Sequence, residues 1–107
     1  VLAANDSMAL GVLDALKAAN RSAVVMSING VIDAVRQVEA GAMLATVDFN
    51  MFKIACIATQ AALRHLKGEP VPDKIVLPTE IIDKTNYKAW LVPVADRLCP
   101  QWEDFVG

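Results

Sequence analysis

The stretch VLAANDSMALG, residues 1–11, joins a short apolar segment to a polar turn and then to a helical pattern. Val1–Ala4 is apolar, and Asp6 or Ser7 directly after it is a suitable cap for the first free amides of a helix. Apolar residues then recur at helical spacing as far as Leu16. The stretch therefore predicts a buried strand that leads into a helix.

The same unit follows twice more along the chain. Ala23–Ile28 is an apolar run that ends at Asn29-Gly30, and helical spacing follows over Val31–Ala40. Met43–Val47 predicts a third strand, and Met51–Lys67 predicts the longest helix. Strands that alternate with helices predict an α/β fold in which a parallel sheet carries helices on both faces.

The remaining residues are less regular. Ile75–Leu77 predicts a fourth strand, and Glu80–Asp83 predicts a fifth short extended piece. From Thr85 onward no period survives, so we expect an irregular tail that Trp90 and Trp102 hold against a surface. In the longest helix, six apolar residues are expected to face inward: Ile54, Ala55, Ala58, Ala62, Leu63 and Leu66.

Polar side chains follow each of the first three predicted strands. The three strand ends are Asn5-Asp6, Asn29-Gly30 and Asp48-Phe49-Asn50. In open α/β sheets, ligands bind beyond the carboxyl ends of the strands. Three amide- or carboxylate-bearing ends in succession therefore predict a polar pocket.

Composition excludes several classes of function. The 107 residues amount to about one domain, and ten Lys+Arg against twelve Asp+Glu give a net charge of −2. This balance leaves no basic surface for nucleic acid, and no apolar run is long enough for insertion into a membrane. No dinucleotide, phosphate-loop or nucleophile-elbow motif is present, so neither an enzyme nor a cofactor is expected. His65 stands without a second metal ligand, so we expect no metal site.

A family resemblance sharpens these expectations. Residues 4–11, ANDSMALG, resemble the A-N-D-x-M-A-L-G turn of ribose-type periplasmic sugar-binding proteins, the soluble receptors of bacterial ABC sugar importers. Further stretches fit that family in order and spacing, as far as about residue 86: residues 38–41, 44–47, 66–72 and 75–78. The resemblance implies a type I periplasmic-binding-protein-like fold, of which this chain is the C-terminal portion.

The resemblance also implies how the chain is divided. Residues 1–48 would be part of the C-terminal lobe, and residues 49–78 a hinge crossing with a segment of the N-terminal lobe. Residues 79–107 would be the return crossing and a C-terminal tail. Because Val1 is not a methionine and begins an apolar strand, we expect that upstream chain has been removed.

Three candidate sugar-binding residues follow from the family pattern. Asn5 matches an asparagine that bonds sugar hydroxyls, a task that suits an amide with two donors and an acceptor. Asn29 replaces the usual aspartate, and Phe49 replaces the usual Gln or Asn at the hinge, where it could stack on a sugar ring. Asn50 is the nearest amide that could take the polar role instead. Each of the three candidates also has a structural interpretation. Asn5 could be a helix cap, Asn29 a left-handed turn residue and Phe49 a core residue.

The resemblance implies a periplasmic protein that binds a sugar or polyol without catalysis and delivers it to the membrane permease of an ABC importer. The alternative is the effector-binding domain of a sugar-responsive transcriptional repressor, a family with the same fold. A severed two-lobe fold would expose apolar faces and could self-associate. An oxidising periplasm would permit a bridge between Cys56 and Cys99, but a helix residue and a distant tail residue make this the less favoured arrangement.

Overall fold

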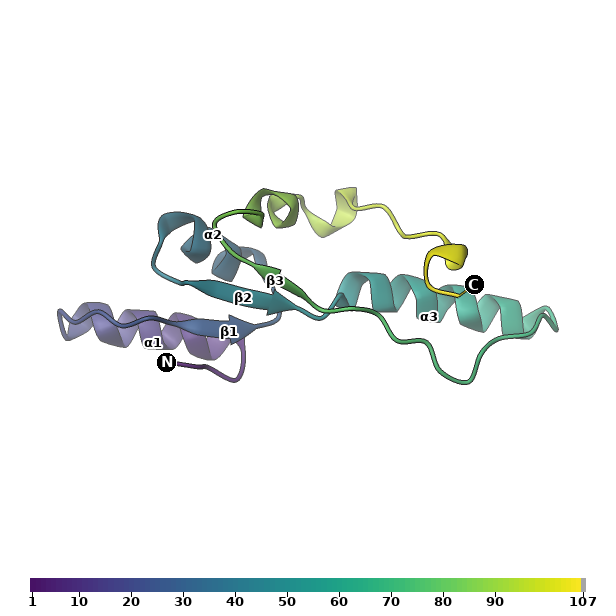
Figure 1. Ribbon diagram of the computed structural model, residues 1–107, viewed down its shortest axis with the longest axis horizontal. Helices are drawn as coiled ribbons and strands as arrows, with labels where there is room; N and C mark the ends of the chain where they lie inside the picture. The colour runs from purple at the N-terminus through teal and green to yellow at the C-terminus, as the bar shows by residue number, and fades with distance from the viewer. Residues whose placement is uncertain (107) are drawn as a thin grey trace.

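The computed structural model describes residues 1–106 as two connected bodies along a 59 Å axis (Figure 1). The first, the sheet body, contains α1 (Asp6–Ala18), α2 (Ile32–Ala40) and the strands β1 (Met26–Ile28), β2 (Ala45–Asp48) and β3 (Glu80–Ile82). The second is α3 (Met51–Leu66), which projects away from the sheet. The radius of gyration is 17.0 Å, larger than the roughly 13 Å typical of a compact domain of this size.

The sheet confirms the predicted α/β fold and its parallel strands. Its order is β1-β2-β3, with β1 parallel to β2 and β3 antiparallel to β2. The predicted first strand forms a single parallel bridge, between Leu2 and Met26. The predicted strand at Ile75–Leu77 is wrong for this structure, because no described strand lies beside that segment to share its backbone hydrogen bonds.

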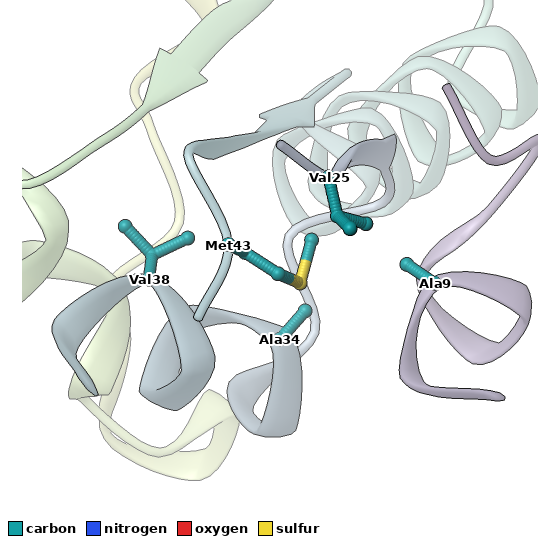
Figure 2. Close-up of a cluster of buried hydrophobic side chains, with 5 residues drawn as sticks. All are labelled: Ala9, Val25, Ala34, Val38 and Met43. Carbon is teal, nitrogen blue, oxygen red and sulfur yellow. The ribbon is translucent and has the colours of Figure 1, made fainter. Parts of the chain in front are cut away.

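One core fills the space between the sheet and its helices. Five buried apolar residues contributed by α1, α2 and the neighbouring loops form it (Figure 2): Ala9, Val25, Ala34, Val38 and Met43. Both helices therefore lie on the same face of the described sheet. Apolar side chains on the other face, Val24, Ile28 and Ile81, are exposed.

The long helix α3 buries a different face from the one the sequence predicts. Cys56 and Ile57 are its buried residues. The six residues expected to face inward are all exposed, Leu66 to 81%. No described helix is both long and apolar enough to cross a membrane.

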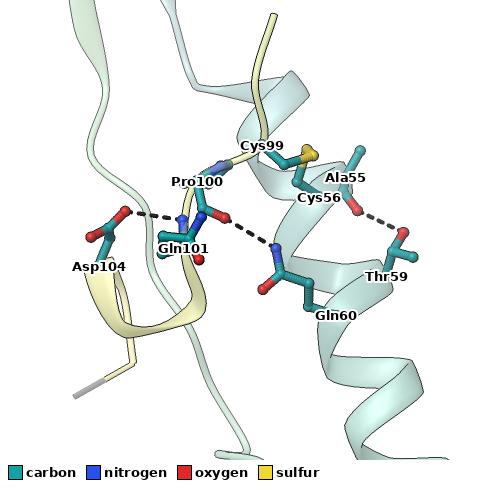
Figure 3. The surroundings of a disulfide bond; sticks show 8 residues. All are labelled: Ala55, Cys56, Thr59, Gln60, Cys99, Pro100, Gln101 and Asp104. Carbon is teal, nitrogen blue, oxygen red and sulfur yellow. Dashed lines mark hydrogen bonds between the residues drawn. A yellow bond between two sulfur atoms is a disulfide. The ribbon is translucent and has the colours of Figure 1, made fainter.

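A C-terminal tail, Tyr87–Val106, begins against α2 and the core, and its last part lies against the buried face of α3. It contains the short 3-10 helices η1 (Tyr87–Leu91), η2 (Val94–Asp96) and η3 (Trp102–Asp104). Cys99 forms a disulfide with Cys56, with the two Cα atoms 5.7 Å apart (Figure 3). The expectation that these cysteines stay unpaired is therefore wrong, because the tail returns along the helix and closes the 43-residue separation.

The tail is anchored by its tryptophans, as the sequence predicts. The Trp102 side chain is buried, and the Arg64 guanidinium lies 4.7 Å from the centre of its ring. Gln60 on the same helix donates a hydrogen bond to the carbonyl of Pro100 (Figure 3). Covalent, aromatic and polar contacts together fix the tail on α3.

Candidate functional site

The register of the strands places the predicted polar residues at one edge of the sheet. Asn5, Asn29 and Asp48 each stand three residues beyond positions that are paired in parallel. Those paired positions are Leu2 with Met26, and Met26 with Ala45. Because the strands run in the same direction, the three polar residues follow their carboxyl ends at a common level.

A tight turn positions Asn29. Its φ is +134° and its amide donates to the carbonyl of Val47 at 2.8 Å. Gly30 follows with a φ of +69°, and a Cβ there would lie 2.9 Å from Ile82 Cδ1 and 3.2 Å from Asp48 Cβ. Only glycine fits this turn. Among residues 1–106, the Asn29 side chain has no hydrogen-bond partner within the chain, so its amide is available to a ligand.

Asp48 lies opposite this turn and joins the end of β2 to the tail. Its Oδ1 accepts from the Asn50 amide at 2.7 Å, and its Oδ2 accepts from Trp90 Nε1 at 2.8 Å. Asn50 has a φ of +63° and donates its side-chain amide to the carbonyl of Pro78 at 2.6 Å. The side-chain nitrogen of Asn50 therefore joins the segment before α3 to the segment that leads to β3.

Asn5 is the helix cap that the sequence assigned to Asp6 or Ser7. Its side-chain oxygen accepts from the amide of Met8 at 2.9 Å. Among residues 1–106, the two amide protons of the Asn5 side chain have no acceptor. Capping therefore uses only the oxygen of this side chain.

Asp6 has a role that sequence analysis missed. It is completely buried, and its carboxylate accepts from the hydroxyls of Ser27 and Thr46, the latter at 2.6 Å. It also accepts from the amide of Val31 at 2.8 Å, at the start of α2. One carboxylate thus joins α1, β1, β2 and the start of α2.

A pocket of about 570 Å³ opens at this edge of the sheet. Asn29 and Asp48 both line it, but neither Asn5 nor Phe49 does. Phe49 is half-buried at the junction with α3. The rest of the lining comes from the start of α2, the start of α3 and the tail: Gly30, Val31, Ile32, Met51, Phe52, Ala55, Val92, Pro93, Val94 and Arg97.

The pocket combines an apolar lining with a few polar groups. Its lining is mostly apolar, with an amide, a carboxylate and a guanidinium as the convergent polar groups. Across the described residues, no group of three or more His, Cys, Asp or Glu side chains could hold a metal ion.

Comparison with known proteins points in the same direction. No protein-family model matches the chain. The chain is 37% identical over 84 residues to the ribose import binding protein of Haemophilus influenzae. This match covers 78% of this chain and 29% of that protein. The chain is 40% identical over 90 residues to a putative rhizopine-binding protein of Rhizobium meliloti, covering 80% of this chain and 29% of that protein.

Solved structures show the same relationship. The fold superimposes with a TM-score of 0.77 on an ABC transporter periplasmic solute binding protein from Actinobacillus succinogenes, whose structure contains D-allose. The two are 29% identical, and the match covers 82% of this chain and 32% of the other. Over about four fifths of its length, this chain is thus a homologue of sugar-binding periplasmic proteins of the ABC-transporter type, and it spans about 29% of the curated relatives' length.

Proposed function

We propose that this chain is part of the substrate-binding component of a bacterial ABC sugar importer, and that it binds a sugar or polyol without catalysis. The observation that carries this proposal is the convergence of Asn29 and Asp48 on one pocket at the carboxyl edge of the sheet. Homology to two named ligand-binding proteins supports it. The protein would act in the periplasm and pass its ligand to a membrane permease.

Binding would use the two kinds of surface that the pocket offers. The Asn29 amide can donate to one hydroxyl and accept from another, while the Asp48 carboxylate has further lone pairs for hydroxyl donors. The apolar side chains around them can pack against the carbon face of a sugar ring. Neither Asn5 nor Phe49 lines this pocket, and we propose that they reach the ligand when the cleft is closed.

The exposed apolar faces support a two-lobe organisation. We propose that residues 1–48 belong to one lobe, residues 49–78 to a hinge and a second lobe, and residues 79–107 to the return crossing and tail. In this arrangement, the remainder of the protein covers the exposed faces of α3 and of the sheet. Closure of the two lobes would bury the ligand between them.

The test uses the complete protein, meaning this chain together with the remainder that brings it to the length of its relatives. Calorimetry against pentoses, hexoses and polyols should identify a ligand. Asn29→Gly should then weaken binding about tenfold, the cost of one lost hydrogen bond in a buried site. Glycine accepts the φ of +134° at this position, so the change removes the amide without backbone strain.

Asn20→Gly is the matched control. Asn20 is also an asparagine with a positive φ, +53°, but it is exposed at the end of α1. Its replacement should leave the affinity unchanged. Equal losses in the two variants, or no ligand among the compounds tested, would contradict the proposed function.

A further inference from the structure

The tail is held on both sides of the candidate pocket. On the sheet side, Tyr87 packs against the core and Trp90 donates to Asp48. On the α3 side, the disulfide at Cys99 fixes it to the helix. The intervening residues 92–97 therefore span the junction between the two bodies (Figure 1), where they contribute four side chains to the pocket lining.

Arg97 is the polar member of this segment. Its Nε donates to the carbonyl of Val92 at 3.0 Å, and its Nη2 donates to the carbonyl of Trp90 at 3.1 Å. These two bonds orient the planar guanidinium. Three of its five N–H donors are left without a partner among residues 1–106.

The charge of Arg97 is balanced within the pocket. Asp48 lines the same pocket, and in the described part of the chain Arg97 forms no ion pair with an acidic side chain. A guanidinium and a carboxylate on one pocket give no net charge, which favours a neutral ligand. The free N–H groups of Arg97 match hydroxyl or ring oxygens, since arginine donates but does not accept.

We propose that the tail completes the sugar pocket and that Arg97 donates hydrogen bonds directly to an oxygen of a neutral sugar or polyol. This proposal rests on the proposed function and deepens it. Val92, Pro93 and Val94 would contact the carbon skeleton of the ligand, and the disulfide would hold this wall in place. The tail is then a determinant of which sugar the protein selects.

The first test compares two arginines in the complete protein. Arg97→Ala should weaken binding of the identified ligand at least tenfold, because a charged donor in the pocket is lost. Arg97→Lys should also weaken it, since an ammonium cannot keep both tail carbonyl bonds and still present a planar fork. Arg36→Ala, at an exposed residue of α2, is the matched control and should change the affinity less than twofold.

A second measurement distinguishes a direct contact between Arg97 and the ligand from a purely structural role of Arg97. It compares how removal of single hydroxyl groups from the ligand changes the affinity of the native protein and of Arg97→Ala. A series of deoxy analogues should include one whose loss of affinity is large for the native protein and small for Arg97→Ala. Equal losses in both proteins for every analogue would show that Arg97 does not touch the ligand and would overturn the proposal.

The disulfide provides a second test. The double variant Cys56→Ser with Cys99→Ser should bind more weakly and release the ligand faster, because the tail is no longer fixed to α3. An unchanged dissociation rate would overturn the role of the bridge in the pocket.

Failure of this proposal and failure of the proposed function give different results. If Asn29→Gly weakens sugar binding but Arg97→Ala behaves like Arg36→Ala, the tail is not part of the site and the proposed function stands. If the complete protein binds no sugar or polyol, both are overturned.

Discussion

The sheet body and the tail-covered helix α3 are held together by different kinds of interaction. The sheet body has a buried apolar core and a fully buried carboxylate, Asp6, that receives three hydrogen bonds. Helix α3 buries two residues and depends on a disulfide and on the Trp102 contact with the tail. The comparison shows that one region is stabilised by its own packing, whereas the other relies on a covalent link and on surfaces it does not itself supply.

Removal of the Asp6 carboxylate should have the largest effect on the sheet body. Asp6→Ala leaves two buried hydroxyls and one backbone amide without an acceptor, at about 1–3 kcal/mol for each unsatisfied group. We expect a loss of about 3–5 kcal/mol, measured by urea unfolding. Asp14→Ala, at an exposed acidic residue of the same helix, should change stability by less than about 0.5 kcal/mol. A similar small effect for Asp6→Ala would show that the buried network does not hold the sheet body together.

Reduction of the disulfide should affect the other region. The Cys56–Cys99 bridge closes a 43-residue separation, which corresponds to about 2–4 kcal/mol of stabilisation. Hydrogen exchange under reducing conditions should accelerate in residues 92–106 and in α3, while α1 and β1 keep their protection. Uniform acceleration over the whole chain would mean that the two regions unfold as a unit and would remove the contrast between them.

The turn at Asp83 should show the smallest effect. Hydrogen bonds from the hydroxyl and then the amide of Thr85 lower the pKa of Asp83 below its usual value near 3.8. Because the pKa is lowered, the ionised carboxylate stabilises the turn at pH values above about 3.8. This contribution is lost as the pH falls through the lower pKa of the folded state. In an NMR titration, Thr85→Ala should raise the pKa of Asp83 towards 3.8. An unchanged pKa would show that the hydroxyl has no effect on the turn.

The contrast between the two regions also explains which parts of the fold could be predicted. Helices α1 and α2 form where the apolar spacing and strand-end turns placed them, because their partners lie within the same 48 residues. The inward face of α3 was predicted wrongly, because its sequence shows a second apolar stripe as well as the one that the tail covers. The pairing of Cys56 with Cys99 depends on the path of an aperiodic tail, for which the sequence contains no local signal.

The candidate site, like the fold, was predictable only where its residues come from the first 48 residues of the chain. Counting from strand ends found Asn29, which lines the pocket, and placed Asn5 at the same edge. Asp48 belongs to the predicted strand-end group but was not singled out, because the family position that drew attention was Phe49. Arg97 could not have been found, since only the return of the tail brings it to the pocket. The ligand-binding roles of Asn5, Asn29 and Phe49 stay predictions.

The disulfide also changes how the molecule would respond to mechanical force. Residues 56–99 form a covalently closed ring that contains β3 and most of α3. A pull on the C-terminus would act on α3 through the sulfur atoms, and the ring would withhold about 150 Å of extended chain, at roughly 3.5 Å per residue, until the bridge was reduced. Stretched between its ends, the oxidised protein would therefore behave as a shorter and stiffer tether than its residue number suggests.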